Sequence, residues 1–129
     1  MAASATVVSG PGPMHTKSIA ASIDGVPTDF VTIEFRDRFL VLITQFQKIG
    51  SLATIEHDMS GDGNHVFSST GLLGRRDDPM TDLCGRHLGA TIAETSDKPV
   101  LLSLSLRNSD TVTLRAVLKV LERDDIRLW

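Results

Sequence analysis

The chain has 129 residues, 41% of them hydrophobic, and a formal net charge of −3. This length is typical of a single domain with one hydrophobic core. The negative charge disfavours nucleic acid or an anionic membrane as the main partner, and a 5% aromatic content without Tyr disfavours a base-stacking surface. The single cysteine cannot form an internal disulfide, which predicts the cytosol or the nucleus. No apolar run approaches the ~20 residues of a membrane-spanning helix.

The first fourteen residues carry no charged side chain and no hydrophobic period, and they contain Gly10-Pro11-Gly12-Pro13. Glycine and proline in this density disfavour both helix and strand. We therefore expect residues 1–14 to be a disordered tail and residues 15–129 to form a single domain.

A hairpin from Val26 to Gln45 is the strongest local signal. Two runs rich in β-branched and aromatic residues, 29–35 and 39–45, flank the polar joint Arg36-Asp37-Arg38. If Phe35 sits opposite Phe39, one face of the hairpin is entirely apolar. The other face then carries Phe30, Thr32, Glu34, Leu40, Leu42 and Thr44, which is more apolar than a wetted face should be.

The remaining pattern predicts further strands over 17–23, 51–57, 66–73 and 100–106. A helix begins at Pro79 and fades near Glu94, with a stripe of Met80, Leu83, Cys84, His87, Leu88, Thr91 and Ile92. A second helix places Leu114, Val117, Leu118 and Leu121 on one side. The order predicts an α+β fold, with an antiparallel sheet of about six strands and two helices packed on one face.

The second face of this sheet is left uncovered because only two amphipathic helices are available. Exposed apolar patches of this kind are usually contact sites, and small residues would let another sheet approach to about 10 Å. The sequence therefore predicts sheet-to-sheet dimerisation. The expected interface residues are Phe30, Thr32, Leu40, Leu42, Thr44, Leu101, Ser103 and Ser105.

Three groups of residues suggest chemistry, and each has a simpler structural interpretation. The best metal or acid–base candidate is the set Glu56, His57, Asp58, Asp62 and His65, which does not match the calcium-loop pattern and is better explained as a solvated loop. Gly71 to Gly74, followed by Arg75 and Arg76, fits a strand exit better than a nucleic-acid-binding loop. Cys84 and His87 lie on a buried stripe, where thiols are usually inert.

These interpretations predict a protein without enzymatic activity, bound metal or cofactor. A metal-dependent hydrolase that uses His57 and His65 remains an alternative.

Several short segments of the chain can be compared with a known family. They are Gly25-Val26-Pro27-Thr28, Thr44-Gln45-Phe46, Lys48-Ile49-Gly50-Ser51-Leu52, Leu72-Leu73-Gly74 with Pro79, Val100-Leu101-Leu102, and the closing helix with Trp129. Together these segments resemble the proteasome assembly chaperone 3 family. The similarity runs from about Ser22 onward in unchanged order. The first fourteen residues and the loop 58–65 are not covered by it.

The resemblance implies a non-enzymatic chaperone with helices on one side of an antiparallel sheet. It implies a dimer, with itself or with the related assembly chaperone 4, that helps to build the α-subunit ring of the 20S proteasome and leaves before maturation. It identifies no catalytic residue and no residue that contacts a proteasome subunit. A small dimeric adaptor of longin or roadblock type, serving another complex, is the alternative function.

Overall fold

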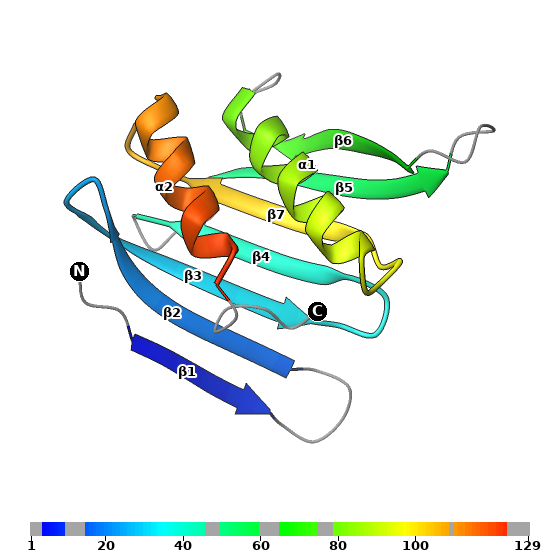
Figure 1. The fold of residues 1–129 in the computed structure, drawn as a ribbon, viewed down its shortest axis with the longest axis horizontal. Coiled ribbons are helices and arrows are strands. Elements are labelled where there is room, and N and C mark those ends of the chain that lie inside the picture. The colour runs from blue at the N-terminus through cyan, green and yellow to red at the C-terminus, as the bar shows by residue number, and fades with distance from the viewer. Residues whose placement is uncertain are drawn as a thin grey trace.

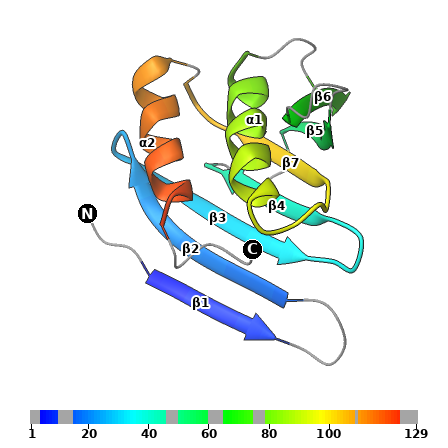
Figure 2. The same ribbon diagram turned by 45° about the vertical axis from the view of Figure 1, so that its right-hand side comes forward.

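A computed structural model describes residues 4–9, 15–45, 50–59, 65–74, 79–108 and 110–123. Within these ranges a seven-stranded sheet carries two helices on the same face, as Figure 1 shows. The elements in chain order are β1 (Ser4–Ser9), β2 (His15–Ile23), β3 (Val26–Glu34), β4 (Phe39–Thr44), β5 (Ser51–Met59), β6 (His65–Leu73), α1 (Pro79–Ala93), β7 (Val100–Ser105) and α2 (Thr111–Leu121). Both helices stay on that side in the turned view of Figure 2. This confirms the predicted α+β fold.

The strand order is β1-β2-β3-β4-β7-β5-β6, so the chain enters the centre of the sheet late, at β7. The sheet is mostly antiparallel, but β7 runs parallel to β4. Its sequence, Val-Leu-Leu-Ser-Leu-Ser, is apolar on both faces at its start, which suits a strand with a neighbour on each side. The sheet is therefore mixed rather than purely antiparallel.

The N-terminal segment differs from the prediction. Ser4–Ser9 forms β1 and pairs antiparallel with β2, from Ser4 opposite Ala20 to Ser9 opposite His15. The segment contains Thr6-Val7-Val8, three residues with β-branched side chains that favour a strand. A disordered tail is thus wrong for 4–9, whereas residues 1–3 and 10–14 lie outside the described residues.

The register of the central hairpin also differs from the prediction. Glu34, not Phe35, lies opposite Phe39, and Phe30 lies opposite Ile43. Phe35 belongs to the turn, where its N–H donates to the carbonyl of Arg38 at 2.8 Å. A shift of one residue moves every side chain of a strand to the other face.

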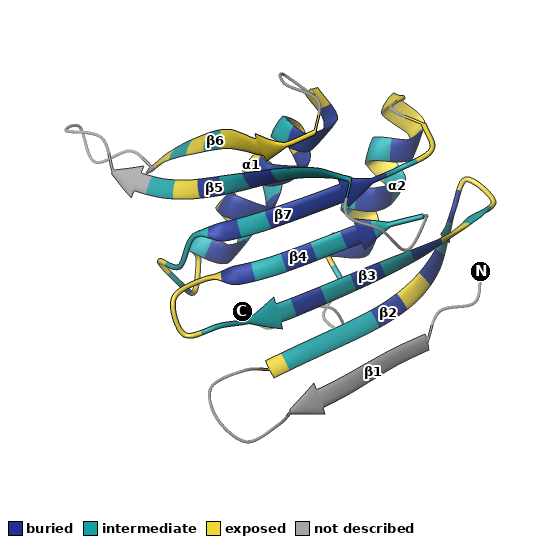
Figure 3. Cartoon of the chain, turned by 180° about the vertical axis from the view of Figure 1, so that it is seen from behind, coloured by how far each residue is buried: buried dark blue, intermediate teal, exposed yellow. Residues whose placement is uncertain are grey.

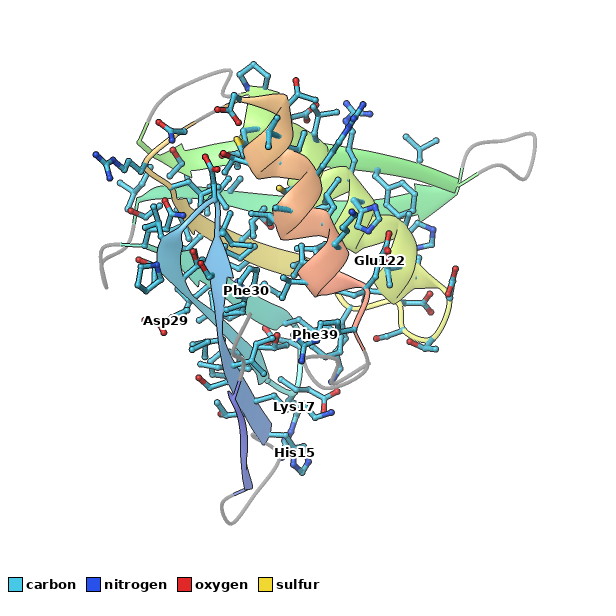
Figure 4. All side chains as sticks on the ribbon, turned by 60° about the vertical axis from the view of Figure 1, so that its left-hand side comes forward. His15, Lys17, Asp29, Phe30, Phe39 and Glu122 are labelled. Atoms are coloured by element: carbon cyan, nitrogen blue, oxygen red, sulfur yellow. The ribbon has the colours of Figure 1, made fainter. Side chains whose placement is uncertain are left out.

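Phe30 and Thr32 are consequently buried beneath the helices, and both are fully inaccessible to solvent. They were predicted as part of the dimer interface, and that placement is wrong. Figure 4 labels Phe30 and Phe39, which come from neighbouring strands beneath α2. The core between sheet and helices has the following large side chains at its centre: Ile19, Ile23, Phe30, Phe39, Val41, Ile43, Ile55, Leu88, Ile92, Leu102 and Leu121.

Helix α1 approaches the sheet closely through two glycines one turn apart. A Cβ at Gly85 would lie 2.7 Å from Cγ1 of Ile55, and a Cβ at Gly89 would lie 2.9 Å from Cδ1 of Phe67. The predicted stripe included Leu83, which is 50% exposed instead. The buried side of α1 is therefore rotated, relative to the predicted stripe, toward Gly85 and Gly89. A search for apolar side chains overlooks these glycines.

We predict that Gly89→Val lowers the free energy of unfolding by about 1–3 kcal/mol, because the added methyl groups collide with Phe67 and Ile55. Valine has a better intrinsic helix propensity than glycine, so the loss would report packing alone. Chemical denaturation measures it. The matched control, Ala90→Val at the exposed neighbouring position, should cost only about 0.5 kcal/mol. Equal losses in the two variants would contradict the close approach.

Helix α2 begins at a well-formed cap. The Asp110 carboxylate accepts a hydrogen bond from the backbone N–H of Thr113 at 2.8 Å. This backbone hydrogen bond lowers the pKa of Asp110 below its ordinary value. Val117 and Leu121 anchor the helix in the core, as predicted, whereas Leu118 is only partly buried.

The cap makes stability depend on pH at the acid end. Because the folded-state pKa is depressed, the contribution of Asp110 is complete well above its ordinary pKa of 3.8 and disappears as the pH falls through the lower folded-state value. We predict that Asp110→Ala is less stable than wild type at pH 7, whereas Asp110→Asn keeps most of the cap. The stability of wild type relative to Asp110→Asn should fall as the pH is lowered from about 5 through 3.8 and below in urea titrations. An unchanged difference over that range would refute the assignment.

Candidate protein-binding face of the sheet

The sheet surface away from the helices is lined by two rows of side chains that cross four strands. Val31, Leu42, Ser103 and Leu52 are register neighbours from β3 to β5, and Ile33, Leu40, Leu101 and Thr54 form the adjacent row. Figure 3 views this side of the molecule, where partly buried and buried segments alternate along the central strands. We call Val31, Ile33, Leu40, Leu42, Leu52 and Leu101 the open-face patch.

None of the eight side chains in these rows is charged. The six members of the open-face patch are only half-buried in the single chain. Ser103 is 2% exposed because the leucines on its two neighbouring strands, Leu42 and Leu52, stand on either side of it. The patch is thus a continuous apolar surface with a small residue near its middle.

Six of the eight residues predicted from the sequence lie on this face. They are Leu40, Leu42, Thr44, Leu101, Ser103 and Ser105. Phe30 and Thr32 lie on the opposite face, and Val31 and Ile33 take their place. Leu52 was also missed, although the pairing of β5 with β7 brings it to the same row as Leu42. The four-residue turn from Phe35 to Arg38 is the signal that could have given the correct register.

Gln45 holds the ends of neighbouring strands together at one end of the sheet. Its side-chain Nε2 donates to Oγ1 of Thr28 at 3.1 Å, while its Oε1 accepts from the backbone N–H of Arg107. Its own N–H donates to the carbonyl of Ser105 at 2.9 Å. One amide side chain therefore links β3 to the end of β7.

Gly50 allows a second close contact at the same edge. A Cβ at this position would lie 2.8 Å from Cβ of Ser105 and would collide with the carbonyl oxygen of Leu104. Only glycine fits where β5 begins beside β7. The two residues together fix the strands that carry Leu42, Ser103 and Leu52.

The candidate metal cluster is not assembled in the part of the chain that the structure describes. Strand alternation puts Glu56 and His57 on opposite faces, and the His57 ring stacks on Phe67 with 5.1 Å between centroids. Across the described residues, no group of three or more His, Cys, Asp or Glu side chains could hold a metal ion. Asp62 lies outside the described residues, as do the side chains of Asp58 and His65.

The other two candidates have structural roles. Gly74 has a φ of 86° and ends β6 against Ser51, while Arg75 and Arg76 fall outside the described residues. Cys84 is completely buried in the core. Among the described helices, none is long and apolar enough to cross a bilayer.

Known proteins match both the sequence and the fold. Residues 41–124 match the family model described as Proteasome assembly chaperone 3. A relative from Nematostella vectensis with this name is 36% identical over 128 residues, covering 92% of this chain and 93% of the relative. The Bos taurus protein of the same name is 30% identical over 112 residues, covering 84% and 91%.

A solved structure supports the fold independently. It is described as the crystal structure of a novel chaperone complex for yeast 20S proteasome assembly. It matches 98% of this chain and 100% of the solved chain with a TM-score of 0.60, at 15% sequence identity. The family model alone covers well over half of the sequence, and the relatives cover most of it. The chain therefore belongs to the proteasome assembly chaperone 3 family.

Proposed function

We propose that this protein is a non-enzymatic chaperone that dimerises through the open-face patch and promotes assembly of the α-subunit ring of the 20S proteasome. Its partner in the dimer is a second copy or a related assembly chaperone 4. Family membership supports the role in proteasome assembly. The open-face patch is the observation that carries the dimer, and the expected compartment is the cytosol or the nucleus.

The central strands give the physical reason for a partner on this face. Strands β4 and β7 pair in parallel, β4 carries Leu40 and Leu42 on the open face, and β7 is apolar on both faces at its start. Parallel strands are normally covered on both faces, yet the helices of a single chain cover one. A second sheet over the open-face patch would remove Leu40, Leu42 and Leu101 from water.

The shape of the face suits sheet packing. Leucines from β4 and β5 flank Ser103, and Ser105 and Thr44 continue the small residues along the strands. Side chains of alternating size interdigitate when two sheets pack about 10 Å apart. The proposed interface comprises Leu40, Leu42, Thr44, Leu101, Ser103 and Ser105 from the sequence prediction, with Val31, Ile33 and Leu52 added by the strand register.

We predict that Leu42→Asp converts the dimer to a monomer, with a loss of affinity of about 100-fold or more, because a carboxylate would be buried without a partner. Light scattering measures the mass, and circular dichroism should show unchanged helix content. A variant that still scatters as a dimer would refute this interface.

The control is Leu83→Asp, the same substitution at a residue of α1 that is 50% exposed on the helix side. It should leave the dimer intact. Loss of the dimer in both variants would mean that the added charge acts through general destabilisation.

Affinity purification of the full chain from lysate, followed by mass spectrometry, tests the function itself. The proposal expects α-type proteasome subunits to be enriched. A longin- or roadblock-type adaptor would instead enrich components of another complex without these subunits, and that result would overturn the proposal.

A further inference from the structure

A hollow of about 500 Å³ lies on the helix side of the molecule, between α2 and the end of β2. Its apolar lining includes the buried side chains of Ile23 and Val120, and Val112 lines it from the first turn of α2 while remaining 67% exposed. Figures 1 and 2 both show α2 lying beside the β2–β3 hairpin at this point. We call this site the α2 hollow. A volume of this size accommodates a few bulky side chains.

Among the described residues, every charged side chain that lines the α2 hollow is basic. Arg115, Lys119 and Arg123 follow one another at four-residue intervals along α2, in a chain whose net charge is −3. Within the described residues, neither Arg115 nor Lys119 makes an ion pair. The hollow is therefore a local basic site on an acidic protein.

Two described carboxylates stand at the ends of α2, and neither lines the α2 hollow. Asp110 accepts the N–H of Thr113 at the helix start. Glu122, labelled in Figure 4, lies 3.9 Å from Nε2 of His87 on α1. Neither group therefore neutralises the α2 hollow from its own helix.

We propose that the α2 hollow binds the client protein, through a segment that presents carboxylates beside a bulky apolar side chain. This inference rests on the proposed function, in which the client is an α-type proteasome subunit. The basic side chains of the hollow attract the carboxylates of the client segment, and the apolar lining of the hollow contacts its apolar side chain. The proposed dimer interface is the open-face patch, and the α2 hollow lies on the other side of the sheet. Both surfaces can therefore be occupied at the same time.

The spacing of the basic residues fits such a segment. Side chains four residues apart on a helix are separated by about 6 Å along its axis. Alternate residues of an extended strand are about 6.7 Å apart, and residues four apart on another helix are again about 6 Å apart. A client segment with acidic residues at either interval would align with Arg115 and Lys119.

The experiment measures the affinity of the full-length dimer for each purified α-type subunit. Wild type should bind at least one, and raising NaCl from 50 to 300 mM should weaken that binding several-fold, because the ion pairs are exposed to solvent. Arg115→Glu with Lys119→Glu should weaken it about tenfold or more. Ala116→Trp, which fills the α2 hollow without changing charge, should weaken it as well.

The matched control is Arg36→Glu with Arg86→Glu, which makes the same charge change at exposed sites outside the hollow and should leave affinity within about twofold. Light scattering on every variant should still report the dimer. If wild type binds a subunit and the two hollow variants bind it equally well, the assignment of the α2 hollow as the client-binding site is wrong, while the proposed function stands. If wild type binds no α-type subunit, or binds only anionic vesicles or nucleic acid, the proposed function fails and the client site with it.

Discussion

The parallel pairing of β4 with β7 is the constraint on which the rest of the molecule depends. Each of these strands alternates between a helix-covered face and an open face, and both faces start out apolar. Phe39, Val41 and Leu102 form the floor of the core. Leu40, Leu42 and Leu101, one residue away in each case, point to the open face. The same two strands therefore contribute side chains both to the core and to the open-face patch.

The sequence predicted the elements well because their local signals are strong. Asp24-Gly25 turns the chain with a positive φ at both residues, which is the hairpin geometry that Asp-Gly favours. Asp110 caps α2, and the two helices cover one face. Two predictions failed. Ser4–Ser9 was assigned to a disordered tail although it forms β1, and assigning Phe35 to a strand placed Phe30 and Thr32 on the wrong face of the sheet. Periodicity finds a strand reliably, but it does not say which residue of the neighbouring strand lies opposite.

Close contacts that depend on the missing side chain of glycine could not be predicted from the hydrophobic pattern of the sequence. Gly85 and Gly89 set the distance between α1 and the sheet, and Gly50 sets the approach of β5 to β7. None of them has a side chain to count in a hydrophobic stripe. The α2 hollow also could not be found from the sequence, because Ile23 lines it from β2 while Arg115 and Lys119 line it from α2, more than ninety residues later in the chain.

Two surfaces of opposite chemistry thus sit on opposite sides of one sheet. The open-face patch is uncharged, so its attraction for a partner depends on apolar area and changes little with salt. The α2 hollow adds basic groups to an apolar lining, so its attraction depends on ionic strength. If the proposed dimer and client sites are both correct, a change that weakens charge interactions at α2 would leave the apolar sheet contact intact. The two proposed sites would then respond to different changes: the open-face patch to the loss of apolar area, and the α2 hollow to charge substitution and salt.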